Sequence, residues 1–361
     1  MPKDMHRLYR IHVFFICVCL SLLPVTAGLG CRGPITLDEY YDSQIEYRTR
    51  PYKFDHFSWQ VNALLEMAEK SIFKPYTNSV EEAIIDRIKE VLTEQGIKVF
   101  PDVRFKMDQP PYLLVISLRD KIVYYDRVLL SREITSSQIA DIEDAIDALG
   151  LSSVVVELGG FAGTYPPIIM ESKNISFVIE TAIEEWLHQY LVFRPLGFLY
   201  LLDCIGIQQE AEIITINETL AGIVSEEVGK IVYDRYYVPE SPNNRKVNMQ
   251  ANNFNFDKEM RETRRQVDIL LKIGDVIGAE NYMEIQRQIF LANGYQIRKL
   301  NQAYFAFHSI YAYDPASVSP IYEQLRQLRD RSDSLTQFID IVASMTSYED
   351  LSLQVKSGPV R

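Results

Sequence analysis

Residues 180–190 read ETAIEEWLHQY, and this stretch is the most informative in the chain. Apolar residues recur on several of its sides, which predicts a largely buried helix. Glu184 and His188 are four residues apart and therefore lie on one helical face, one turn from each other. Glu185 lies about 100° around, at the margin of that face. Such a polar stripe either faces water or, because buried carboxylates need partners, binds a divalent cation.

A second segment, residues 216–224, reads INETLAGIV and predicts another helix. Glu218 stands among apolar residues there, and small residues follow it on one face, where another helix could approach closely. Glu218 is therefore expected to join the polar stripe of the first helix. The alternative is that Asn217 or Thr215 caps this helix and that Glu218 complements its dipole.

The remaining pattern predicts an α+β fold, in which a mixed α/β half precedes an all-helical C-terminal lobe. In the first half, strands are expected at 97–105, 112–118, 122–130 and 152–158, with a hairpin over 112–130, an edge strand at 164–170, and helices at 57–73, 80–94 and 135–149. The edge position is expected because Pro166 and Pro167 have no backbone N–H to donate to a neighbouring strand. Helices are then expected at 175–193, 211–233, 259–273, 279–293, 297–311, 321–328 and 334–343, and a loop at 238–256.

This pattern divides the chain into five parts. We expect a signal peptide or a membrane or lipid anchor at 1–31, a linker at 32–55, an α/β lobe at 56–195, a helical lobe at 196–350 and a tail at 351–361.

The N-terminus has the layout of an export signal. Basic residues precede an uncharged run from Val13 to Gly30, and Cys31 follows immediately. The residues before Cys31 are similar to a bacterial lipobox. We therefore expect export to the cell envelope, on the extracytoplasmic side of the membrane. Lipidation at Cys31, an uncleaved anchor and free secretion all remain open.

Composition narrows the classes of function. The chain is 47% hydrophobic and 24% charged, which is ordinary for a globular protein. Its net charge of −12 argues against a general nucleic-acid binder, so no nucleic-acid partner is expected. Cys204, the one cysteine beyond the N-terminal segment, is expected to be a small buried hydrophobe.

Together, the two helical segments resemble the gluzincin class of zinc metallopeptidases, the thermolysin- and aminopeptidase-like family, in an uncharacterised exported bacterial branch. That family carries His-Glu-x-x-His on one helix and Asn-Glu-x-x-Ala/Ser on a later helix. Residues 293–308, which read NGYQIRKLNQAYFAFH, resemble the same branch. The resemblance covers about residues 55–350 and implies a zincin-like mixed sheet whose edge strand, just before the active-site helix, pairs with an extended peptide.

Position by position, the resemblance implies Glu184, His188 and Glu218 as metal ligands and Glu185 as the general base. Glu184 stands where the family has its first histidine. Zinc remains the expected metal, although two carboxylates and one imidazole shift the preference towards Mn²⁺ or Fe²⁺. The outcome is an active enzyme with altered metal use, a slow metal-bound one, or a degenerate scaffold.

If the protein is active, a metal-activated water attacks a peptide bond of a peptide or protein substrate. Tyr304 or His308 is the candidate oxyanion donor, unless both belong to a half-buried polar fringe. Arg298 holds either a substrate carboxylate or a structural acid. The main rival function is a catalytically inactive zincin-fold envelope protein that acts as a binding module. A weaker rival is a structural helical protein without a metal.

Overall fold

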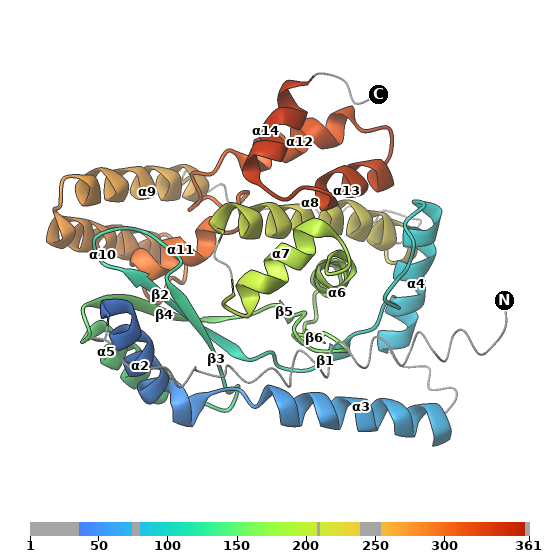
Figure 1. The fold of residues 1–361 in the computed structure, drawn as a ribbon, viewed down its shortest axis with the longest axis horizontal. Coiled ribbons are helices and arrows are strands. Elements are labelled where there is room, and N and C mark those ends of the chain that lie inside the picture. Colours follow the sequence, from blue (N-terminus) through green and yellow to red (C-terminus); the bar gives the residue numbers. More distant parts are fainter. Residues whose placement is uncertain (1–35, 74–79, 208–209, 239–253, 358–361) are drawn as a thin grey trace.

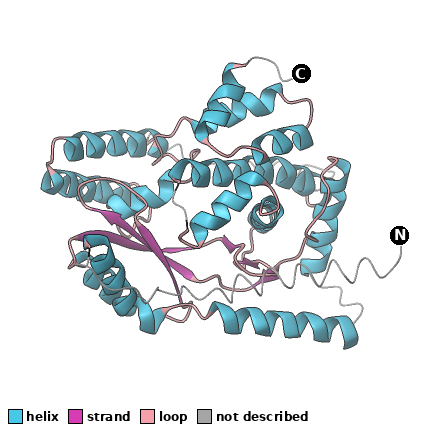
Figure 2. Ribbon diagram, viewed as in Figure 1, coloured by secondary structure: helices cyan, strands magenta, loops and turns pink. Residues whose placement is uncertain are grey.

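The computed structural model describes residues 36–73, 80–207, 210–238 and 254–357, which form a mixed α+β fold (Figures 1 and 2). Helices make up most of it, and two small sheets lie between helices on either side. The broad α+β class is thus confirmed. The expected export segment at 1–31 and most of the expected loop at 238–256 lie outside the described residues. Within the described ranges, no helix is long and apolar enough to cross a bilayer.

The larger sheet is antiparallel and has the strand order β3-β2-β4. Strand β2 (Tyr112–Leu118) forms a hairpin with β3 (Asp126–Leu130) and also pairs with β4 (Leu151–Glu157). The predicted hairpin and the strand after it are confirmed, although the connection between β2 and β3 is longer than expected. Helix α5 (Ser136–Asp147) begins at a capping box formed by Thr135 and Gln138.

Strand β2 is buried on both faces. Leu114 and Ile116 belong to the core formed with α5, whereas Leu113 and Val115 pack with Ala303 on the other face. Because both faces are covered, the middle of β2 reads as a continuous apolar run.

The smaller sheet lies next to the candidate site. Its order is β1 (Lys106–Met107), β6 (Ile168–Ile169) and β5 (Gly160–Phe161). A short strand does lie within 164–170, but its predicted edge position is wrong, because β6 lies in the middle and, among the described residues, β1 and β5 form the two edges. The prolines do not interfere, since Pro167 needs only its carbonyl, which accepts the N–H of Lys106.

The strand predicted at 97–105 is also wrong. This stretch has no ladder partner among the described residues, although Ile97, Val103 and Phe105 are buried. These apolar residues pack against helices, so their alternation does not reflect sheet pairing.

Residues 37–52, which were expected to be part of a linker, are helical. Helix α2 (Leu37–Thr49) begins at a capping box between Thr36 and Glu39, and a short 3₁₀ helix (Arg50–Tyr52) follows. Ile45 is buried against the larger sheet, which gives α2 a place in the core. Helix α3 (His56–Phe73) then runs along the lower edge in Figure 1.

The main core surrounds two long helices, α6 (Ile175–Leu191) and α8 (Ala211–Tyr236). Helices α4 (Val80–Glu94) and α7 (Pro195–Cys204) pack beside them (Figure 1). This core draws residues from Ile84 to Leu351, so the two expected lobes share one hydrophobic interior.

The C-terminal part is helical, as predicted. It contains α9 (Phe256–Lys272), α10 (Val276–Ala292), α11 (Gln302–Ser309), α12 (Ile321–Arg331), α13 (Leu335–Ala343) and α14 (Tyr348–Lys356). Helix α11 starts five residues later than predicted because Asn301 caps it and also donates to the carbonyl of Ser153 in β4. The predicted tail is partly α14, in which Leu351 is fully buried.

Candidate metal centre

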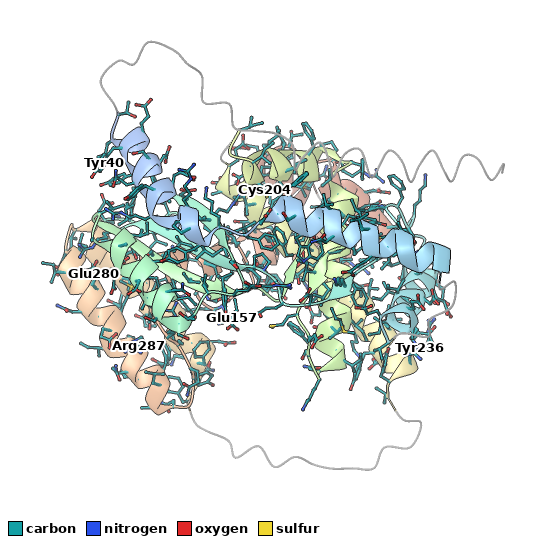
Figure 3. The ribbon with its side chains drawn as sticks, turned by 90° about the horizontal axis from the view of Figure 1, so that it is seen from below. Tyr40, Glu157, Cys204, Tyr236, Glu280 and Arg287 are labelled. Carbon is teal, nitrogen blue, oxygen red and sulfur yellow. The ribbon has the colours of Figure 1, made fainter. Side chains whose placement is uncertain are left out.

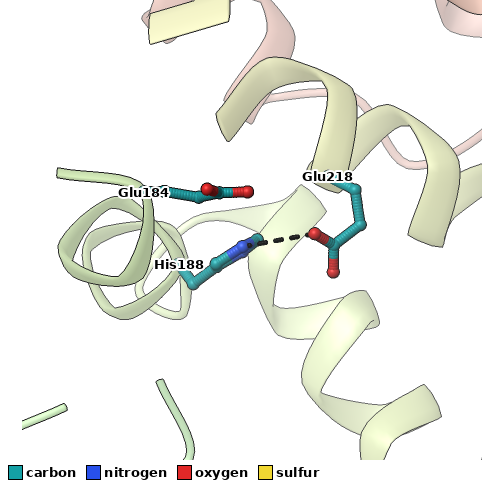
Figure 4. A group of neighbouring side chains, drawn as sticks. All are labelled: Glu184, His188 and Glu218. Carbon is teal, nitrogen blue, oxygen red and sulfur yellow. Dashed lines mark ion pairs between the residues drawn. The ribbon is translucent and has the colours of Figure 1, made fainter. Parts of the chain in front are cut away.

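Helix α6 carries the polar stripe. Asn174 caps its N-terminus, and buried apolar residues hold most of its sides in the core. Trp186, which has no exposed surface, donates its ring N–H to the carbonyl of Pro101 at 2.9 Å. This anchoring fixes the rotation of α6 about its axis and points Glu184 and His188 towards α8 (Figure 4).

Helix α8 brings Glu218 to that stripe. The helix begins at Ala211, so Thr215, Asn217 and Glu218 lie within it, and the alternative in which Asn217 or Thr215 caps the helix is wrong. Both side chains are buried, at 0% and 6% exposure. The two helices approach closely, because a Cβ at Gly229 would lie 2.7 Å from Cγ of Glu180.

The three predicted ligands converge. One atom each from Glu184, His188 and Glu218 can be chosen so that all lie within 4.8 Å of one another. Figure 4 shows the two α6 side chains and Glu218 of α8 pointing into the same space. Three atoms this close together have a common central point that is at most about 2.8 Å from each of them. Zinc–ligand bonds are shorter, at about 2.0–2.2 Å. A contraction of less than about 1 Å would therefore complete a three-ligand site.

The imidazole of His188 is held from three sides. Its Nδ1 lies 2.8 Å from Oδ1 of Asn217, its Nε2 lies 3.4 Å from a carboxylate oxygen of Glu218, and its ring stacks on Tyr200. With the carbonyl oxygen of Asn217 facing it, Nδ1 donates, which leaves Nε2 to face the two glutamates. This is the arrangement that orients a metal-ligating histidine.

The ionisable side chains of the site shift one another's pKa values. Burial alone would lower the pKa of His188, but Glu218, Glu185 and Glu184 together outweigh it and raise that pKa to about 10. Burial alone would raise the pKa of Glu218, but His188 and the hydroxyl of Tyr200, which donates at 2.6 Å, lower it. Among the described residues, Glu184 has no such partner, and burial raises its pKa to about 7. A cation that binds here would therefore displace the proton of Glu184.

Glu185 lies beside the ligands, against the edge of the smaller sheet. A Cβ at Gly160 in β5 would lie 2.3 Å from Oε1 of Glu185, so only glycine leaves room there. Burial raises the pKa of Glu185 to about 8, and a hydrogen bond from the backbone of Ala162 partly opposes the rise. A cation at the three ligands would lower this pKa again.

The two predicted oxyanion donors, Tyr304 and His308, contact each other, and His308 also contacts Asp314. Nδ1 of His308 is 2.7 Å from Oδ2 of Asp314, and its ring packs on Tyr304. No hydrogen bond or ion pair among the described residues joins either side chain to the three ligands. Both side chains are half-buried. Their helix, α11, starts late and packs on the larger sheet.

Sequence reasoning missed three tyrosines near the site. The hydroxyl of Tyr200 donates a hydrogen bond to Glu218. The pKa values of Tyr311 and Tyr313 are raised mainly by burial, and nearby glutamates, which include Glu184 and Glu218, raise them further. The backbone N–H of Ala312 donates to Thr219 of α8 at 3.2 Å and so holds the segment in place. The ring of Tyr313 fits over Gly222, where a Cβ would lie 2.6 Å from it.

The donor set fits a divalent cation. Two carboxylates and an imidazole are ligands that Zn²⁺, Mn²⁺ and Fe²⁺ all accept. Nδ2 of Asn217 is buried without a hydrogen-bond partner among the described residues, but as an N–H donor it needs an acceptor and would not bind the cation. Comparison of the chain with known protein families, with curated proteins and with solved structures finds no match.

Proposed function

We propose that this protein is a metal-dependent peptidase of the gluzincin type, with Glu184, His188 and Glu218 as the ligands. The observation that carries the proposal is the convergence of these side chains from two helices, with the buried Glu185 beside them. Zinc is the expected metal, and Mn²⁺ or Fe²⁺ is the alternative that two carboxylate ligands favour. A zincin-like fold is part of the same proposal.

In the proposed reaction, a water molecule attacks the carbonyl carbon of the peptide and the C–N bond breaks. The metal would polarise that carbonyl and acidify the water. Glu185 accepts the proton of the attacking water and delivers it to the leaving amine, which balances the hydrolysis. Asn217 and Tyr200 keep His188 and Glu218 in position through the contacts described above.

The oxyanion that develops on the substrate needs a hydrogen-bond donor. We assign this role to Tyr311 or Tyr313 rather than to Tyr304 or His308. The support is their electrostatic proximity to the glutamates of the site and the anchoring of their segment on α8. Both hydroxyls stay protonated at neutral pH because burial raises their pKa values.

The rival proposal is a zincin-fold binding module without catalysis. It is favoured by the ion pair between His188 and Glu218, which together with Asn217 and Tyr200 stabilises much of the site without a cation. The low exposure of His188 and Glu218, 7% and 6%, also fits a closed site.

Substitution of the proposed base separates the two functions. Glu185→Gln is expected to lower the rate of peptide hydrolysis by about 10²–10⁴-fold while metal content is unchanged. Glu180→Gln on the same helix is the matched control and should stay within a few-fold of the wild type. Rates are measured with Zn²⁺, Mn²⁺ and Fe²⁺ on a mixed peptide library. Equal rates in the wild type and Glu185→Gln would contradict the assignment of Glu185 as the general base. A wild-type protein that binds metal but does not hydrolyse peptides would favour the binding module.

We also propose that the protein is exported and held at the extracytoplasmic face of a membrane through residues 1–31. The uncharged run from Val13 to Gly30 behind basic residues supports this proposal.

A further inference from the structure

Helix α3 carries a stripe of exposed apolar side chains, which we call the α3 stripe: Phe57, Val61, Leu65 and Ala68. The first three are 50%, 38% and 58% exposed, and Ala68 is exposed as well. Their spacing of three and four residues places them on one side of the helix. An exposed apolar face of this kind marks a surface that contacts another apolar phase.

The opposite side of α3 is fixed to the protein. Gln60, at 2% exposure, donates to the carbonyl of Tyr165 at 2.6 Å and accepts the N–H of the same residue at 2.9 Å. Ala63 is also buried, at 3% exposure. These contacts set the rotation of the helix, so the α3 stripe faces outward. Helices α2 and α3 lie along the lower edge in Figure 1 and towards the viewer in Figure 3.

The outward side of α3 has little charge. Between Phe57 and Ala68 the one ionisable side chain is Glu66, which pairs with Lys106 at 3.0 Å. Ser58 and Asn62 supply the other exposed positions. In a chain with a net charge of −12, this uncharged face suits the interface of a zwitterionic bilayer better than a charged partner.

We propose that the α3 stripe lies against the lipid surface of the membrane to which residues 1–31 tether the chain. The described residues begin at residue 36, immediately before α2. Helix α3 is therefore among the first elements after the uncharged run of 13–30. The acidic first turn of α2 stays in water. This inference rests on the proposed anchor and is independent of the metal centre.

The test places a tryptophan in the stripe. The full chain with Leu65→Trp is reconstituted in phosphatidylcholine vesicles that contain brominated acyl chains, which quench tryptophan at short range. The unaltered chain supplies the emission of the two native tryptophans, one of which, Trp186, is fully buried. Most of the emission added at position 65 should be lost, and added salt should not restore it, because the contact is apolar.

The matched control is Ile273→Trp, at a position 73% exposed after α9, whose added emission should persist. Equal quenching of the two variants would overturn the proposal, as would no quenching of Leu65→Trp or failure of the chain to float with vesicles. A concentration-dependent emission shift of Leu65→Trp without vesicles and without lipid quenching would assign the stripe to a second copy and also overturn it. Peptidase assays do not enter this test, so its failure leaves the proposed function untouched.

Discussion

At the scale of single residues, Glu184 is the least constrained of the three candidate ligands. His188 and Glu218 each have a hydrogen-bond partner that orients them, whereas the described residues provide none for Glu184. Burial without such a partner raises the pKa of Glu184 to about 7. If the proposed site binds a metal, its affinity is therefore expected to depend most on the residue at position 184.

Glu184→His should strengthen zinc binding, because imidazole suits zinc better than a carboxylate whose pKa is raised. We expect the Kd for zinc to fall by at least about tenfold, or ~1.4 kcal/mol. Competition with a chromophoric chelator measures this change. Glu180→His, one turn earlier on α6, controls for the added imidazole and should leave the Kd unchanged. Weaker binding in Glu184→His would exclude a ligand role for this residue.

Asn217→Ala should weaken metal binding through His188. Removing the acceptor of Nδ1 frees the ring to rotate, and loss of such an orienting partner typically costs about 10–100-fold in metal affinity. Asn217→Asp restores an acceptor and should recover most of the affinity. If Asn217→Ala binds metal as tightly as the wild type does, Asn217 does not position the histidine.

The side chains that the sequence could predict are those related by helical spacing. Glu184 and His188 share a face because they are one turn apart, and Glu218 was recognisable as a polar residue in an apolar helix. Tyr311 and Tyr313 lie on the connection after α11, where no periodicity relates a residue to a distant helix. Their position depends on tertiary packing, such as the contact with Gly222.

At the scale of elements, the site depends on how closely β5 approaches α6. Gly160 lets the strand backbone lie directly against the carboxylate of Glu185. The sequence showed two adjacent glycines after a strand but not that β5 would lie at an edge of the smaller sheet and β6 in its middle. Strands of two residues are too short to be recognised from alternating apolar and polar residues. The order of such strands in the sheet is decided by tertiary packing.

Gly160→Ala should displace Glu185, because the new Cβ would lie 2.3 Å from Oε1. We expect a loss of hydrolysis with metal content retained, and a loss of about 1–3 kcal/mol in the free energy of unfolding. Gly159→Ala is the neighbouring control. Its Cβ would meet only the ring of Phe177, at 3.2 Å, so a smaller effect is expected in urea titration and activity. Equal effects would show that β5 does not place Glu185.

Helix boundaries depended on caps rather than on apolar spacing. Helix α2 was missed because only Ile45 and Thr49 are buried, although Thr36 and Glu39 form a capping box that the sequence contains. Helix α11 was predicted too long because Ile297 and Leu300 continue the apolar pattern, yet they are buried outside the helix. The spacing of apolar residues indicates which side chains are buried. It does not by itself indicate a helix, because side chains of irregular segments can be buried as well.

At the scale of the whole molecule, charged clamps join the C-terminal part to the larger sheet. Arg298 makes two hydrogen bonds to the carboxylate of Glu143, at 2.8 and 2.6 Å, and a third to the carbonyl of Val155. Glu143 is 4% exposed. Arg298 thus holds a structural acid, which is one of the two alternatives that the sequence left open.

Arg298→Ala should destabilise the protein by about 1.5–3 kcal/mol, because it removes the charged hydrogen bonds to the buried carboxylate of Glu143 and leaves only the longer ion pair with Lys299, at 3.7 Å. Arg265→Ala is the surface control, since its pair with Glu262 is exposed and worth less than about 1 kcal/mol. Chemical denaturation of both variants measures the difference. A loss as small as that of the control would mean that the clamp does not hold the sheet and the C-terminal part together.

We propose that two helices of one shared core close three side chains around a cation. Metal analysis of the purified protein after exposure to zinc, manganese or iron tests it most directly. We predict close to one metal ion per wild-type chain, loss of that ion in His188→Ala, and its retention in His308→Ala, whose ring pairs with Asp314. A wild-type chain without metal, or equal metal in the wild type and His188→Ala, would contradict the account.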